Sequence, residues 1–306
     1  MIDWAIVAEQ GLNGLQLGVM LFLLAAGLTL VFGIMDVINL AHGSFFMVGA
    51  YLAATLVHIT GNFLAAVVAA AGAAGLIGVA VEAGVMRTLY RRDHLDQVLA
   101  TFGLILVFNE GVKLVWGPVP IFLDPPAALG GRVDLLGIPY PSFRLALIGT
   151  GLAAALFLWW LIVRTRLGML IRAGSSNPEM IAVLGVDVRS LFTFVFAVGA
   201  ALSGLAGAMA GPVLSVQIGM GEDILIPAFV VVVIGGIGSV RGAFAGAMLV
   251  GMVDTAGRIA LPSLFAFLFD PATATGVAGP VANMAIYLVM AVVLAFRPRG
   301  LFPAGA

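Results

Sequence analysis

The sequence predicts an all-α integral membrane protein, built as a polytopic bundle of about nine transmembrane helices, with eight to ten acceptable. Of its 306 residues, 62% are hydrophobic and 9% are charged, whereas a soluble domain carries about 25% charged residues. Apolar runs near the length that a helix needs to cross a bilayer recur along the chain. Glycine supplies 40 residues, which suits closely packed membrane helices.

Charge and cysteine content exclude several other classes of protein. The net charge is −1, and no cluster of Lys and Arg is interleaved with aromatic residues, so we expect membrane lipid and no nucleic acid as a partner. Cysteine is absent, which excludes disulfides and thiolate metal sites, and we expect no metal and no cofactor. No Lys or Arg precedes Arg87, so the first apolar segment is expected to stay in the mature protein.

The spans are predicted from the apolar runs. They cover residues 12–34, 37–57, 63–86, 98–116, 145–163, 191–213, 224–238, 243–261 and 281–296. The range 224–238 is short, and its length also fits a re-entrant helix. We expect it to be a thin full crossing.

Arginines predict the orientation, because cytoplasmic loops are enriched in Lys and Arg. They gather in three loops: Arg87, Arg91 and Arg92; Arg164, Arg166, Arg172 and Arg189; and Arg297 and Arg299. Even numbers of predicted spans separate these loops, so all three can lie in the cytoplasm, which places the N-terminus outside. The Pro- and Gly-rich range 117–143 is then an external loop.

The basic loop 164–190 contains a predicted short helix. Ser176 or Asn177 is the expected N-cap and Pro178 the first helical residue, and Gly185 marks the end. Its apolar residues are spaced for one face, namely Met180, Ile181 and Leu184. Such a helix suits docking into a groove of another protein, although a helix lying in the lipid interface has the same pattern.

Polar side chains near the start of the second predicted span are candidates for a translocation pathway. Asn39, His42 and Ser44 lie in an apolar context, where polar groups are costly unless they meet water, protein or a ligand. Hydrogen bonding between helices is the alternative for these three residues. For Asp36 we expect only backbone contacts at the helix start.

Two glycine-rich elements follow. Gly235, Gly236, Gly238 and Ser239 can bring exposed backbone groups to a polar solute, and a tight turn between two helices explains them equally well. A stripe of small residues recurs every fourth position and is expected to mediate helix packing. It consists of Gly199, Ser203, Gly207 and Gly211.

Three stretches together resemble a known family. Residues 172–186 (RAGSSNPEMIAVLGV), 39–51 (NLAHGSFFMVGAY) and 235–246 (GGIGSVRGAFAG) are similar to permeases of the branched-chain amino-acid ABC transporter family. The resemblance covers nearly the whole chain and implies a single permease domain over residues 1–306, located in the bacterial inner membrane.

The resemblance also implies partners and a coupling site. The partners are a second permease subunit, homologous or identical, two cytoplasmic ATPase subunits and a periplasmic substrate-binding protein. The residues implied to contact an ATPase lie in the loop 164–190 and are Ser175, Asn177, Glu179 and Met180. The chain lacks the glycine-rich phosphate loop that ends in Gly-Lys-Ser/Thr, so we expect a transport subunit rather than an enzyme.

The expected function is that of the permease subunit of an ATP-driven importer for branched-chain amino acids or similar small polar solutes. Urea, short amides and other small solutes remain alternatives. An ion-coupled secondary transporter is less favoured, because it needs ionisable residues deep in several spans. Here most ionisable groups lie near span ends. Glu110 with Lys113 and Asp254 with Arg258 are expected to be local pairs or groups that reach to the membrane surface, and Glu82 can pair with Arg87. A membrane serine protease would need an activated Ser and His, and His42 and Ser44 offer no such context.

A short echo suggests an internal repeat. Residues 48–52 (VGAYL) resemble residues 198–202 (VGAAL). Many transporters contain repeated halves, but five apolar residues leave the question open.

Overall fold

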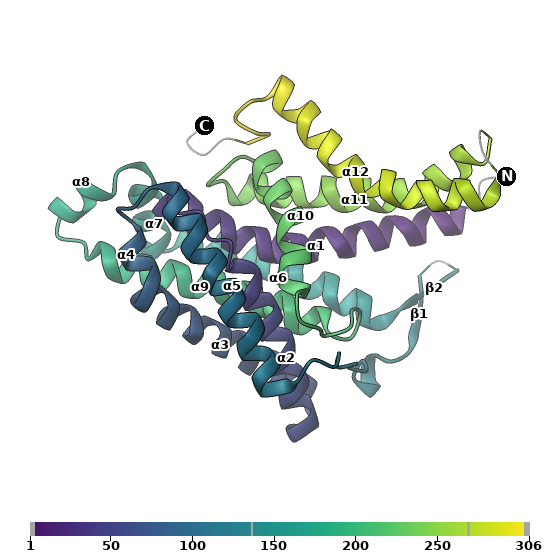
Figure 1. Cartoon of the computed structure of the whole chain (residues 1–306), viewed down its shortest axis with the longest axis horizontal. Helices are drawn as coiled ribbons and strands as arrows, with labels where there is room; N and C mark the ends of the chain where they lie inside the picture. The colour runs from purple at the N-terminus through teal and green to yellow at the C-terminus, as the bar shows by residue number, and fades with distance from the viewer. Residues whose placement is uncertain (1–3, 136, 268–269, 303–306) are drawn as a thin grey trace.

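The computed structural model describes residues 4–135, 137–267 and 270–302, and most of them are helical (Figure 1). Within these ranges, eight helices are long and apolar enough to cross a membrane, and the protein is an all-α polytopic membrane protein. These helices are α1 (Trp4–Met35), α2 (His42–Thr60), Phe63–Leu89 (α3 Phe63–Val81, the π-helical turn η1 Glu82–Met86 and α4 Arg87–Leu89), α5 (His94–Trp116), α6 (Ser142–Arg164), α9 (Val188–Ala210), α11 (Val240–Phe265) and α12 (Pro271–Phe296).

Three shorter helices complete the bundle: α7 (Arg166–Ser176), α8 (Pro178–Val183) and α10 (Met220–Gly235). The expected full crossing at 224–238 corresponds to α10. It has 16 residues, or about 24 Å of helix, less than the roughly 30 Å of a bilayer core. By length and composition alone, eight helices of the described residues qualify as spans, which lies within the expected range of eight to ten.

The second predicted span, 37–57, begins too early. The helix α1 ends at Met35, Asp36 takes a positive φ of 53°, and α2 starts only at His42. The His42 ring lies beside Gly27 of α1, eight residues before Met35, which is about 12 Å along the helix. The chain therefore turns back into the bundle before α2 begins.

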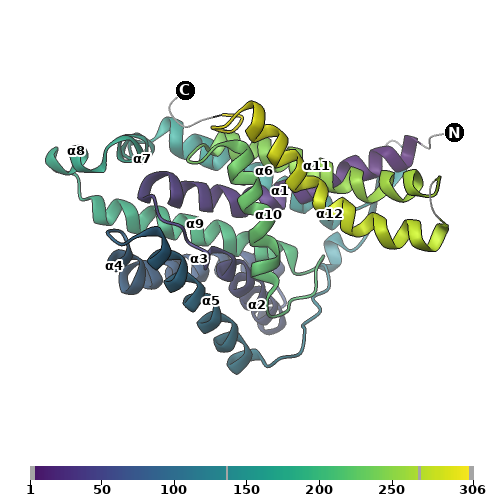
Figure 2. The same ribbon diagram turned by 45° about the horizontal axis from the view of Figure 1, so that its top comes forward.

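The segments α1–α3 and α9–α11 repeat one arrangement in opposite directions. α1 contacts α10 and α11, and α9 correspondingly contacts α2 and α3. Figures 1 and 2 show α1 running from the N-terminus towards α7, and α9 running back from α8. The structural repeat therefore pairs α1 with α9 and α2 with α10. The sequence similarity between residues 48–52 and 198–202 had instead aligned part of α2 with part of α9.

The described residues of the range 117–143 contain structure that their composition did not predict. A 3₁₀ turn, η2 (Ala127–Leu129), precedes an antiparallel hairpin of β1 (Arg132–Leu135) and β2 (Ile138–Pro141). The Tyr140 hydroxyl donates to Asn13 Oδ1 of α1 at 3.1 Å, and Ile121 pairs with Val216. These contacts fix the hairpin at the end of the bundle near the start of α1.

Candidate transport site at the basic end

Five arginines from distant parts of the chain line one cavity. They are Arg87, Arg91, Arg172, Arg189 and Arg241. The carbonyl oxygen of Arg299 lies beside Gly236 in the nearby α10–α11 turn. We call this side of the bundle the basic end, and the enrichment of cytoplasmic loops in Arg predicts that it faces the cytoplasm.

The cavity, which we call the chamber, has a volume of about 2090 Å³. Its walls come from α1, α6, α7, α8, the start of α9 and the α10–α11 turn. One face of α6 supplies four apolar residues at intervals of four, three and four, namely Leu152, Leu156, Trp159 and Val163. All four residues are at least 39% exposed, so this face of α6 is only partly covered by the rest of the protein.

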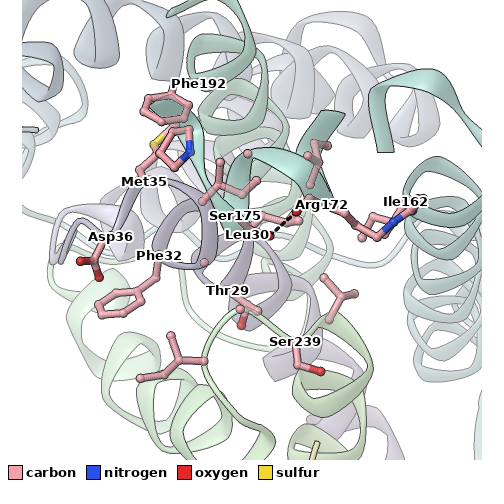
Figure 3. A pocket seen from close by; sticks show the side chains of 18 of the residues that line it. Thr29, Leu30, Phe32, Met35, Asp36, Ile162, Arg172, Ser175, Phe192 and Ser239 are labelled. Atoms are coloured by element: carbon pink, nitrogen blue, oxygen red, sulfur yellow. Dashed lines mark hydrogen bonds between the residues drawn. The ribbon is translucent and has the colours of Figure 1, made fainter. Parts of the chain in front are cut away.

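Polar groups from three elements also line the chamber (Figure 3). The Thr29 hydroxyl of α1 is buried and makes no hydrogen bond. Ser239 caps α11 by accepting the N–H of Gly242 at 3.1 Å. Arg172 of α7 donates to the carbonyl of Ile162 and accepts the Ser175 hydroxyl at 2.9 Å through its own carbonyl.

The deep end of the chamber is aromatic. Phe22 is the lining residue of α1 farthest from the basic end, thirteen residues or about 20 Å of helix before Met35. Its ring meets Phe244 of α11 edge to face, with the ring centres 5.1 Å apart. Phe22 is only 1% exposed.

The helices α7 and α8 line the chamber at the basic end. Asn177 caps α8 by accepting the N–H of Met180 at 2.9 Å, and Pro178 follows as the first helical residue. Of the two predicted N-caps, Asn177 is therefore the one used. The hydroxyl of Ser190 and then its backbone N–H hold the pKa of Asp187, the cap of α9, below its usual value.

The apolar residues of α8 do not share one face as expected. Ile181 is buried and packs beside Gly174, near Leu191 and Ile34. Met180, Val183 and Leu184 point outwards with exposed fractions of 57%, 83% and 75%. Of the other candidate coupling residues, Ser175 and Glu179 line the chamber. The helix thus has one inner anchor and one exposed apolar surface.

The candidate pathway residues Asn39, His42 and Ser44 lie outside the chamber. Their side chains are 0%, 0% and 2% exposed, and their polar atoms make no hydrogen bond of ordinary geometry, although the Leu24 carbonyl lies beside the His42 ring. His42 lies where α2 meets α1 and α9, because its ring is beside Gly27 and Ser203 donates to its carbonyl at 3.0 Å, whereas the backbone N–H of Ser44 lies near Gly221 of α10. The chamber residues Gly238 and Ser239, in the glycine-rich turn between α10 and α11, are therefore not joined to these three residues by the chamber.

The glycine turn is itself divided. Gly238 and Ser239 line the chamber, whereas Gly235 and Gly236 face the α11 and C-terminal backbone. Gly236 and Gly238 have φ angles of 102° and 81°, which favour glycine. The N–H groups of Leu301 and Phe302 bond to the carbonyls of Ile234 and Gly235 at 2.8 and 3.0 Å. The C-terminal segment thus closes a tight turn.

The small-residue stripe of α9 faces other helices along most of its length. Gly199 lies against Gly27 of α1, and Gly207 lies against the Phe46 carbonyl of α2. Ser203 makes the bond to His42 described above, and Gly211 lies near Leu123 of the external loop. Backbone atoms of α9 and its neighbours therefore approach closely.

Several polar groups were missed by sequence reasoning. Asn109 of α5 donates to Glu222 Oε1 at 2.6 Å, and Glu222 Oε2 is buried without a partner. Glu222 lay just outside the predicted apolar run, which began at Ile224. Thr29 was hidden within an otherwise apolar span, where a single hydroxyl gives little signal.

The three predicted ion pairs are confirmed, with N–O distances of 3.1 Å for Arg87–Glu82, 3.4 Å for Lys113–Glu110 and 2.8 Å for Arg258–Asp254. Glu82 also accepts the Tyr90 and Thr193 hydroxyls at 2.7 Å each. Burial of Tyr90, and then its hydrogen bond to Glu82, raise the pKa of Tyr90 above its usual value.

Comparison with known proteins identifies the family. The family described as branched-chain amino acid transport system, permease component, matches residues 11–295. The chain belongs to this permease family. It is a permease subunit of an importer, located in the inner membrane.

Relatives match the permease along most of its length. The high-affinity branched-chain amino acid transport system permease protein BraD of Pseudomonas aeruginosa is 28% identical, over 96% of this chain and 94% of BraD. LivH of Escherichia coli, described in the same words, is 27% identical over 80% of this chain and 84% of LivH. The ribose import permease protein RbsC of Escherichia coli is 28% identical over 76% of this chain and 72% of RbsC. No solved structure matches the permease.

Proposed function

We propose that the permease imports branched-chain amino acids, or small polar solutes of similar shape, and that ATP hydrolysis on separate subunits drives it. Its partners are a second permease subunit, homologous or identical, two cytoplasmic ATPases and a periplasmic binding protein. The chain carries no phosphate loop of its own. The energy therefore comes from another protein.

The surface of α8 carries this proposal. Met180, Val183 and Leu184 form an exposed apolar patch on a capped helix at the basic end. Exposed apolar side chains on a rigid helix suit insertion into a groove of a partner. We assign that groove to an ATPase subunit, and we assign Ser175 and Glu179, which face the chamber, to the inner side of the same coupling element.

Branched-chain amino acids are favoured as the substrate by two observations. The names of BraD and LivH refer to these solutes, and the α6 wall of the chamber is apolar. The match to RbsC, named for ribose import, makes sugars a control to test beside urea and short amides.

Reconstitution tests the function. Proteoliposomes containing the permease, its second permease subunit, both ATPases and the binding protein should accumulate leucine, isoleucine or valine only with ATP. Urea and ribose should accumulate far more slowly. Uptake by the permease alone under an ion gradient would instead support a secondary transporter.

The coupling surface is tested by Met180→Arg, with Met180→Leu as the matched control. The arginine variant should insert and fold normally, because Met180 is exposed, but ATP hydrolysis should no longer produce uptake. The leucine variant keeps an apolar side chain and should couple normally. Normal coupling in the arginine variant would rule out this surface.

A further inference from the structure

We propose that residues 297–302 form a strap that holds the turn between α10 and α11 in its present position and thereby stabilises this conformation of the permease. The turn consists of residues 236–239. The effect of the strap on transport rests on the proposed import function. Its hold on the turn does not, and can be measured without any transport.

The strap supplies hydrogen bonds that α10 needs at its end. The last carbonyl groups of a helix have no partner within the helix. In α10, the carbonyls of Ile234 and Gly235 accept the N–H groups of Leu301 and Phe302 at 2.8 and 3.0 Å. These donors follow α12, so the last described residues of the chain return to α10 and cap it.

Backbone atoms of two other segments press on the turn. A methyl group at Gly236 would lie 2.9 Å from the carbonyl oxygens of Arg299 and Phe302 in the strap. A methyl group at Gly33 of α1 would lie 2.5 Å from the Cα of Gly238. Glycine permits such close backbone approach, and closely packed backbone leaves little free space. The turn is therefore held between α1 and the strap.

The equivalent turn of the other repeat has no strap. It joins α2 to α3, with Gly61 at a φ of 65° and Asn62 as the N-cap of α3. The local design is the same in both turns, because Asn62 and Ser239 each accept an N–H from three residues later at 3.1 Å. Among the described residues, nothing lies within 4 Å of a methyl group placed at Gly61. The two turns thus differ mainly in what covers them.

This difference makes the two repeats unequal when the conformation changes. Inverted repeats move relative to each other during alternating access. Movement of the α10–α11 turn away from the strap breaks the bonds of Leu301 and Phe302, and a polar group that loses its partner away from water costs free energy. Movement of the α2–α3 turn breaks no bond of this kind among the described residues. The strap therefore favours the state in which the α10–α11 turn is fixed.

Hydrogen exchange tests the strap, because it measures the opening of individual segments. The whole transporter is studied in lipid nanodiscs without nucleotide. Truncation after Gly300 removes both donors, and truncation after Phe302 keeps them and is the matched control. After the first truncation we expect the amides of residues 236–243 to exchange at least about tenfold faster, because two hydrogen bonds are lost. The amides of residues 61–66 should be unchanged.

A single substitution tests one bond without shortening the chain. Proline has no N–H, so Leu301→Pro leaves the carbonyl of Ile234 without its donor. Leu301→Met keeps the N–H and a similar apolar volume, and is the matched control. We expect faster exchange of residues 236–243 in the proline variant and no change in the methionine variant.

Three outcomes of the exchange experiment would overturn the proposal. The first is equal exchange of residues 236–243 in the unmodified permease and in the chain truncated after Gly300. The second is equal acceleration by the truncation after Phe302. The third is equal acceleration at residues 61–66, which would show general loosening of the bundle rather than release of one turn.

Transport is measured separately, with the whole transporter in proteoliposomes. Truncation after Gly300 should lower leucine uptake per ATP hydrolysed by at least about fivefold, because the balance between conformations shifts, and truncation after Phe302 should not. Faster exchange with an unchanged ratio would show that the strap does not set the conformation, which overturns the proposal and leaves the import function intact. If the unmodified transporter shows no ATP-driven uptake, the import function is wrong, and the exchange experiment still decides whether the strap holds the turn.

Discussion

Gly207 of α9 has no room for a side chain, because a methyl group there would meet the Phe46 carbonyl of α2. We expect Gly207→Ala to destabilise the permease by about 1–3 kcal/mol through forced separation of the two helices. Gly72→Ala is the matched control, because nothing lies within 4 Å of the added group, and better helix propensity should stabilise it by about 0.5–1 kcal/mol. Thermal unfolding in detergent measures both. Equal midpoints would contradict the close approach seen at Gly207.

Glu82 is buried but fully engaged, with Arg87, Tyr90 and Thr193 as its partners. We expect Glu82→Gln to lower stability by about 1–3 kcal/mol, because a neutral amide replaces a charged acceptor, while ATP-driven uptake persists. Thermal unfolding and leucine uptake are measured on the same preparation. A complete loss of uptake with unchanged stability would instead indicate a proton relay.

At the scale of single elements, the start of α8 depends on one side chain. Asn177→Ala removes the bond to the Met180 N–H, and loss of an N-cap costs about 1 kcal/mol. We expect faster hydrogen exchange in α8 and less uptake per ATP hydrolysed. Asn177→Asp keeps the accepting oxygen and should retain coupling. If the alanine variant behaved like the aspartate variant, the order of α8 would be irrelevant to coupling.

The hairpin of β1 and β2 depends on Tyr140. Burial raises the pKa of Tyr140 above its usual value, so the folded state favours the neutral phenol. Its contribution is present below the unfolded pKa of about 10 and is lost as the pH rises through the folded pKa. We expect the hairpin to become more sensitive to protease above about pH 10. Tyr140→Phe should lose the Asn13 bond at every pH and show no such alkaline step.

At the scale of the whole molecule, the deep end of the chamber should act as a barrier. Phe244→Ala removes half of the aromatic pair, so we expect leucine to leak through the proteoliposomes without ATP. Phe244→Leu keeps apolar volume and should leak less. Thermal unfolding controls for the stability loss of about 3–5 kcal/mol that such truncations can cause. An alanine variant that is as stable as the unmodified permease and shows no leak of leucine would contradict closure by Phe22 and Phe244.

Hydropathy could predict the bundle because each long helix carries its own apolar run. It could not predict that α2 starts at His42, because four of the five residues 37–41 are apolar and continue the hydrophobic run. Asp36 takes a positive φ, which Asp tolerates, but an Asp between apolar residues does not by itself locate a helix end. The caps of α8 were predictable from Asn177 and Pro178, which act locally. The chamber was not, because Phe22, Leu152 and Phe244 come from three distant helices and meet only in the folded chain.

The opposed directions of α1 and α9 carry one more consequence. Two similar units with inverted topology can exchange conformations, so that each unit adopts the conformation that the other has in this structure. Such an exchange would produce a second state from the same helix pairs, in which the chamber opens to the opposite face. We therefore expect the permease to have a second form that the opposed pair α1 and α9 makes accessible.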